Sequence, residues 1–137
     1  VAAYDHDPLR GIGIAFVNHG CGFTGNGEQE IINAVVEMER LSGGRSALYV
    51  STVEMGQGLQ TVLRKIAARE LGCDYRDVVY DNPDTDRVPD SGPTVASRST
   101  MVVGYLIQQC ARELKARWDE GLEVRIRKQY HHPEGLT

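Results

Sequence analysis

The sequence predicts an α+β fold, in which a mixed sheet packs against two helices. Three features carry this prediction: short apolar or alternating segments typical of strands, two segments with apolar residues at helical spacing, and a turn that joins two strands directly. The predicted order of elements is β-ββ-α-β-α-β. Because a hairpin is combined with crossover helices, we expect a mixed sheet rather than a doubly wound one.

The first half of the chain supplies the predicted strands. Residues 11–18, GIGIAFVN, are apolar and β-branched, which predicts a buried first strand. A β-hairpin is predicted over residues 31–53, where Ala34, Val36 and Met38 alternate onto one face. The sequence SGGR then provides the turn into a second strand, SALYVSTV.

Two helices are predicted from apolar residues that recur every three or four positions. One such stripe spans residues 59–71, and Gly72 is suited to end that helix. A second stripe predicts a helix within residues 97–119. Residues 77–82 and 122–130 are predicted as a short strand between the helices and as the final strand.

Length and composition indicate one ordinary domain covering residues 1–137, with 41% hydrophobic and 25% charged residues. Because the chain starts at Val1 and stops just after an alternating stretch, we expect it to be a fragment of a larger subunit. The net charge of −4, without a block of Lys or Arg, argues against a nucleic-acid partner. No apolar run approaches the roughly 18 residues of a membrane span, so we expect a cytoplasmic protein.

The sequence offers little support for a metal site. Cys21, Cys73 and Cys110 are scattered and form no CxxC pair, which favours buried free thiols over a disulfide, zinc or iron–sulfur site. His131 and His132 are adjacent, so on a strand they point to opposite faces. We therefore expect no metal ligand here.

Both predicted helices are entered from loops with few large side chains. The first follows Met55-Gly56-Gln57-Gly58, and the second follows the Ser/Thr-rich stretch 91–100. Helix starts present free N–H groups and the positive end of the helix dipole, so these two entrances suggest a phosphate-bearing ligand.

Each entrance also has a purely structural interpretation. The glycines of GQG can serve only a turn with positive φ, and Ser97 or Ser99 can be a plain N-cap. Arg98 favours the anion-binding interpretation, because a guanidinium beside free N–H groups suggests that an anion arrives.

With these segments placed, the sequence resembles the molybdopterin-binding subunit or domain of molybdenum hydroxylases, the xanthine dehydrogenase and aldehyde oxidase group. The matching pieces are RGIGIAF with GFTGNGE, then STVEMGQGLQTVLRKIAARELG, then NPDTDRVPDSGPTVASRSTMVVG, in the family's order across most of the chain. The last two pieces together are highly specific.

The resemblance implies that two segments bind the pyranopterin and its phosphate and that two segments line the substrate pocket. The implied cofactor-binding residues are Met55, Gly56, Gln57, Ala96, Ser97, Arg98, Ser99 and Thr100. The implied substrate-pocket residues are Phe23, Thr24, Val95 and Ala96. For Phe23 the residues alone favour ordinary core packing.

The resemblance further implies a part in hydroxylation of an N-heteroaromatic or aldehyde substrate at a molybdenum centre. The family's catalytic glutamate lies in a downstream glycine-rich motif that is not in this chain, so no catalytic residue is expected here and the fragment alone should be inactive. Iron–sulfur clusters and FAD would belong to other domains or subunits. The resemblance leaves open whether the pterin carries a cytosine nucleotide, as bacterial members often have.

Two other functions stay open at this point. The chain can be a stand-alone, non-enzymatic module that binds a nucleotide or another anion through the same helix starts. It can also be a structural piece whose glycines only shape turns. As a fragment, it is expected to self-associate through an apolar face or a sheet edge.

Overall fold

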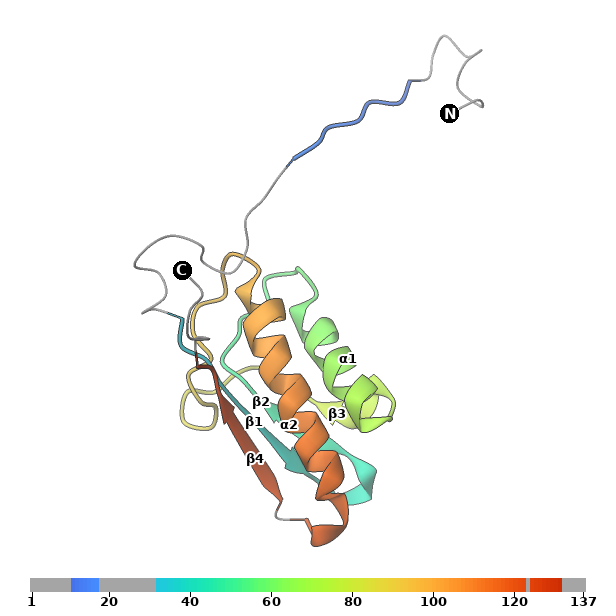
Figure 1. Cartoon of the computed structure of the whole chain (residues 1–137), viewed down its shortest axis with the longest axis vertical. Coiled ribbons are helices and arrows are strands. Elements are labelled where there is room, and N and C mark those ends of the chain that lie inside the picture. The colour runs from blue at the N-terminus through green and yellow to red at the C-terminus, as the bar shows by residue number, and fades with distance from the viewer. Residues whose placement is uncertain (1–10, 18–31, 123, 132–137) are drawn as a thin grey trace.

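A computed structural model describes residues 11–17, 32–122 and 124–131 of the chain. In these residues a four-stranded sheet carries two helices side by side on one face, which confirms the predicted α+β class (Figure 1). The strands are β1 Val35–Arg40, β2 Ser46–Tyr49, β3 Val78–Val79 and β4 Arg125–Gln129, and the helices are α1 Leu59–Leu71 and α2 Gly104–Ala116.

The sheet is mixed, as the sequence predicts, with the strand order β3-β2-β1-β4. Strand β1 pairs antiparallel with both β2 and β4, whereas β2 pairs in parallel with β3. The predicted hairpin is β1 and β2, and its turn at Ser42–Gly44 places Gly43 and Gly44 at φ of 70° and 77°. This turn sets the register in which Met38 lies opposite Leu48.

Helix α1 has the bounds that its apolar stripe predicts. It begins after Gly58, which has a φ of 80°, and ends at Gly72, which has a φ of 81° and donates its N–H to the carbonyl oxygen of Ala68 at 2.8 Å. A left-handed glycine at this position closes a helix without a steric penalty on Cβ. The buried positions include Leu59 and Leu63, which lie on the side of the helix that packs against the sheet.

The hydrophobic core lies between the two helices and the sheet. Val36 and Met38 of β1 pack in one cluster with Leu63 of α1 and Leu106 of α2, and each is at most 1% exposed. Cys110 is fully buried in this cluster, and burial raises the pKa of its thiol to about 12. For Cys110 the interpretation as a buried free thiol is confirmed, whereas Cys73 is free but only partly buried, and Cys21 lies outside the described residues.

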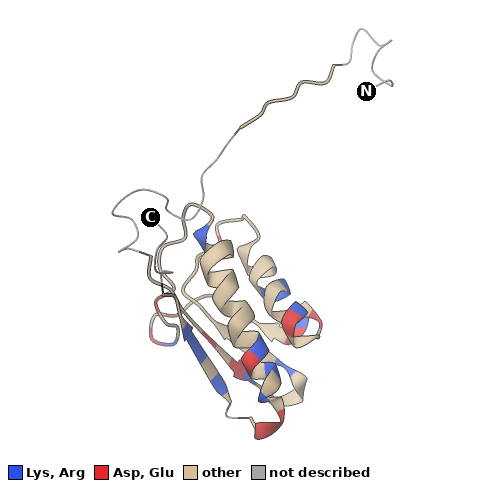
Figure 2. Ribbon diagram, in the orientation of Figure 1, with Lys and Arg blue, Asp and Glu red and all other residues tan. Residues whose placement is uncertain are grey.

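The other face of the sheet is polar. Arg125 and Arg127 of β4 both form ion pairs with Glu37 of β1. In the ribbon, basic positions of β4 (blue) accordingly lie next to an acidic position of β1 (red) (Figure 2). Tyr49 of β2 donates its hydroxyl to Glu39 at 2.7 Å. No helix in the described part of the chain covers this face.

The predicted first strand is wrong for the residues that are described. Residues 11–17 have no strand structure and are exposed, with Ile14 at 74% and Phe16 at 93%. Local β-propensity was the basis of that prediction, but a buried strand also needs a paired neighbour and a covering layer. No described residue supplies either to this segment.

Strand β3 is shorter than predicted, and the second helix lies within the predicted range 97–119. Strand β3 contains only Val78 and Val79, because the chain turns into the proline-containing loop soon afterwards. Helix α2 begins at Gly104, after a π-helical turn over Ser99–Val103. Neither of the described helices is long and apolar enough to cross a membrane.

Candidate functional site

The two loops that enter the helices lie against each other at one end of the sheet. Ser51 and Ser91 exchange hydrogen bonds: each backbone N–H donates to the other's hydroxyl oxygen, at 3.0 and 2.8 Å. Two residues further along, the N–H of Val53 donates to the hydroxyl of Thr94 at 3.0 Å. The segment before α1 is therefore joined directly to the segment before α2.

These loops form one pocket with a volume of about 280 Å³. Its lining residues are Met55, Gln57, Leu59, Thr94, Val95, Ala96, Ser97, Ser99 and Thr100. Six of the eight predicted cofactor-binding residues are in this set; Gly56 and Arg98 are not. Of the predicted substrate-pocket residues, Val95 and Ala96 line the same pocket, whereas Phe23 and Thr24 lie outside the described residues.

The second loop turns back on itself through an unusual backbone conformation. Ala96 and Ser97 have φ of 47° and 58°, and among the described residues they are the ones with positive φ that are not glycine. Such conformations cost about 1–3 kcal/mol each, and they cluster at active sites, ligand clamps and switch regions. The turn directs the chain into the π-helical start at Ser99.

Arg98 supports this turn from behind. Its side chain is fully buried, and the guanidinium donates to the carbonyl oxygens of Ser91, Pro93 and Asn33 at 2.8, 2.9 and 2.6 Å. Burial lowers the pKa of the group, while the charge of Asp90 opposes that shift. The sequence suggests that the Arg98 guanidinium would bind an anion. In the structure it donates its hydrogen bonds to backbone carbonyl oxygens instead.

The entrance to α1 is also less bare than the sequence suggests. The Glu54 carboxylate accepts hydrogen bonds from the N–H groups of Gly56, Gly58 and Gln60, at 2.8, 3.0 and 2.9 Å. These bonds, that of Gln60 first, lower the pKa of Glu54. The amide of Gln57 closes the same loop, because its Oε1 accepts the N–H of Met55 at 2.6 Å and its Nε2 donates to the carbonyl oxygen of Val53 at 3.0 Å.

The turn interpretation of GQG is confirmed, whereas an anion bound at this entrance stays a prediction. Gly56 and Gly58 have φ of 99° and 80°, as a turn interpretation requires, and the loop also borders the pocket. Glu54 lies outside the apolar spacing pattern that predicts the helix, so the sequence reasoning did not indicate its role. An acidic residue just before a glycine-rich helix entrance is the feature that would have indicated it.

Comparison with known proteins identifies the family of the chain. A family model described as the molybdopterin cofactor-binding domain matches residues 2–129. The chain belongs to this family. The matched residues include both loops of the pocket, so the site lies within the part of the domain that the family shares.

Relatives of the domain are much longer proteins. Over 108 residues it is 32% identical to a probable xanthine dehydrogenase subunit of Bacillus subtilis, and the match covers 79% of this chain and 14% of that protein. Over 113 residues it is 29% identical to the carbon monoxide dehydrogenase large chain of Afipia carboxidovorans, covering 80% of this chain and 14% of the relative.

A solved structure supports the same placement. The aldehyde oxidoreductase from Desulfovibrio desulfuricans matches with a TM-score of 0.62 and 25% identity, over 84% of this chain and 14% of the other. The domain thus spans a small part of each of these proteins.

Ser99 gives an independent indication that the pocket of this molybdopterin cofactor-binding domain takes a polar ligand. The residue is 5% exposed and lines the pocket, yet its hydroxyl has no hydrogen-bond partner among the described residues. Buried polar groups are rarely left unpaired, because the lost hydrogen bonds to water cost about 1–3 kcal/mol. The hydroxyl oxygen is itself covered, so the side chain would have to rotate toward the pocket to meet a phosphate oxygen or a pterin heteroatom. In that rotamer the hydroxyl would be satisfied, and the pocket would fit the cofactor that the family name specifies.

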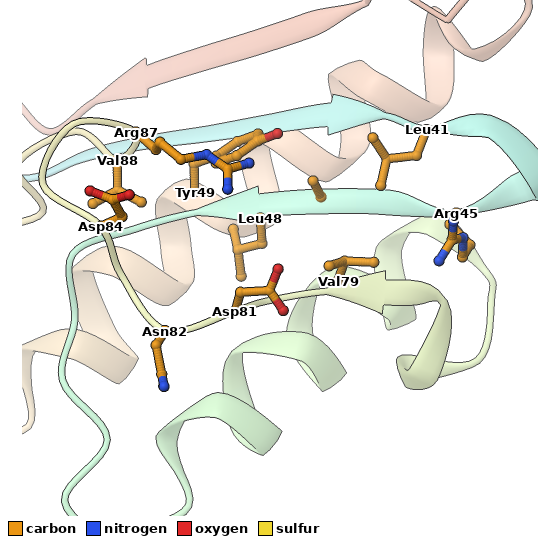
Figure 3. Close-up of a pocket in the computed structure, with 11 residues that line it drawn as sticks. Leu41, Arg45, Leu48, Tyr49, Val79, Asp81, Asn82, Asp84, Arg87 and Val88 are labelled. Atoms are coloured by element: carbon orange, nitrogen blue, oxygen red, sulfur yellow. The ribbon is translucent and has the colours of Figure 1, made fainter.

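A second pocket lies on the opposite side of the sheet from the helices, under the loop that follows β3 (Figure 3). It has a volume of about 300 Å³, and charged side chains of both signs border it, including Arg45, Asp81, Asp84 and Arg87. The sequence reasoning did not indicate it, because its residues come from separate elements.

No group of His, Cys, Asp or Glu in the described residues is arranged to hold a metal ion.

Proposed function

We propose that the domain holds molybdopterin in the pocket between the Met55–Gly58 loop and the Thr94–Thr100 loop, as part of a molybdenum hydroxylase. The observation that carries this proposal is the pocket itself, which is lined by two loops far apart in sequence and includes Ser99, whose hydroxyl is unpaired among the described residues. The family match supports the choice of cofactor.

In this proposal the pocket residues bind and orient the cofactor, and they do not transfer protons. The nine lining residues include no carboxylate, imidazole or ammonium group. The hydroxyls of Ser97 and Thr100, and that of Ser99 once its side chain rotates, would be the polar groups that meet a phosphate at the helix start. When bound, the cofactor would supply the molybdenum centre at which hydroxylation takes place.

Val95 and Ala96 lie on the side of the pocket that we assign to the substrate, an N-heteroaromatic compound or an aldehyde. Phe23 and Thr24 are proposed to complete that wall. The catalytic base would come from outside this chain. We propose that the rest of a molybdopterin subunit, together with iron–sulfur and FAD domains or subunits, completes a cytoplasmic enzyme, because the domain spans only 14% of relatives such as the Bacillus subtilis protein.

A charge placed in the pocket tests this proposal. Thr100 is exposed at the pocket wall, so Thr100→Glu in the complete enzyme should repel the cofactor phosphate and reduce molybdenum content at least about tenfold. Thr85→Glu is the matched control, because Thr85 is exposed and lies outside the pocket. Molybdenum is measured by elemental analysis of purified protein. Equal molybdenum content in both variants would contradict the proposed location.

A further inference from the structure

The two helix entrances beside the pocket differ in what fills them. At α1, one oxygen of the Glu54 carboxylate accepts from Gly56 and Gly58, and the other accepts from Gln60. The start of α2 and its preceding π-turn has no acidic residue in the first turn and no side-chain cap. One entrance therefore already contains an anion of the chain's own, and the other contains the unpaired Ser99 hydroxyl.

Glu54 fixes the shape of the loop that borders the pocket. Its hydrogen bonds tie together residues on both sides of Gln57, across two glycines that are in the left-handed region. Glycine loses the most conformational freedom on folding, so a loop with two of them needs such ties to keep one conformation. Met55 and Gln57, the loop's two pocket-lining residues, are held between these ties.

We infer that Glu54 is a positioning residue for cofactor binding: its carboxylate acts as the built-in anion of the α1 entrance and holds the Met55–Gly58 loop in its pocket-forming conformation. The inference rests on the proposed function. Glu54 is not among the residues that line the pocket, so it acts through the loop and not by touching the cofactor. It also excludes a second anion from α1, because the donors that such an anion would use are occupied.

The test compares Glu54→Gln with Glu70→Gln in the complete enzyme. Glu70 is a matched control near the opposite end of α1, where its carboxylate accepts hydrogen bonds from Arg112 and Gln108. The neutral amide of Glu54→Gln keeps one acceptor oxygen and turns an NH₂ group toward a backbone donor. We expect the cofactor to dissociate about five to ten times faster, the loss typical of a removed N-cap, while the control dissociates at the wild-type rate.

Two further arms separate positioning from general stability. In Glu54→Ala, added acetate is expected to slow cofactor loss again, because a free carboxylate can occupy the vacated donors, whereas acetate should not change the wild type. Unfolding midpoints of the cofactor-free proteins are measured alongside. A Glu54→Gln protein that keeps its cofactor as long as the wild type would overturn the inference. So would variants that lose the cofactor faster only in proportion to their lower unfolding midpoints, with a rate of loss that acetate does not change. Wild-type enzyme that contains no molybdenum would instead overturn the proposed function.

Discussion

Replacing Arg98 with Met is expected to lower the free energy of unfolding of the chain by about 3–5 kcal/mol. Methionine keeps an unbranched apolar stem but donates no hydrogen bond. The carbonyl oxygens of Ser91, Pro93 and Asn33 would then lose the donor that holds them together. The measurement is urea unfolding followed by circular dichroism.

Arg76 offers the matched control for this substitution. Its side chain is 75% exposed and makes a 3.5 Å ion pair with Asp74, so Arg76→Met should change the free energy of unfolding by less than about 1 kcal/mol. Arg98→Lys should not restore stability, because one ammonium group cannot reproduce the fork of donors that reaches three separate oxygens. Similar losses from Arg98→Met and Arg76→Met would show that Arg98 does not organise the loop.

Replacing Gly92 with Ala is the second substitution with a large expected effect. An added Cβ would overlap the carbonyl oxygen of Asn33 and lie 2.8 Å from both terminal nitrogens of Arg98. Gly92 also has a φ of +74°, which disfavours any side chain. We expect the free energy of unfolding to fall by about 3 kcal/mol or more, from steric overlap added to backbone strain.

Gly44→Ala isolates the backbone part of that loss. Gly44 has a nearly identical φ of +77°, but no atom lies within 4 Å of the position that an added Cβ would take. This control should lose only about 1–2 kcal/mol in the same urea unfolding experiment. If the two alanine variants unfold at the same urea concentration, the close packing of Gly92 against Asn33 and Arg98 is not a feature of the protein in solution.

The elements that depend on local pattern follow from the sequence. The bounds of α1 are predictable because an apolar stripe and two terminal glycines act within one segment, and the hairpin is predictable because its turn adjoins both strands. The segment 11–17 is different: its apolar residues specify what a strand could bury but not which neighbour would pair with it.

The candidate site shows the same division. The scarcity of large side chains at two helix entrances is visible in the sequence, and the structure brings Met55, Gln57 and Ser99 together there as pocket residues. The sequence cannot show which backbone oxygens a buried guanidinium meets, so Arg98 is predicted as an anion ligand although it supports the loop. The role of Glu54 was predictable from the sequence, because the carboxylate and its hydrogen-bond donors lie within six residues of each other.

A structure of the complete, cofactor-loaded enzyme would show directly whether the two helix entrances hold the pterin. We expect pterin density in the pocket lined by Met55, Gln57 and the segment 94–100, with a phosphate oxygen within hydrogen-bonding distance of the Ser99 hydroxyl. Cofactor density elsewhere, such as the pocket bordered by Arg45 and Arg87 on the other side of the sheet, with Ser99 far from any ligand atom, would contradict the proposed site.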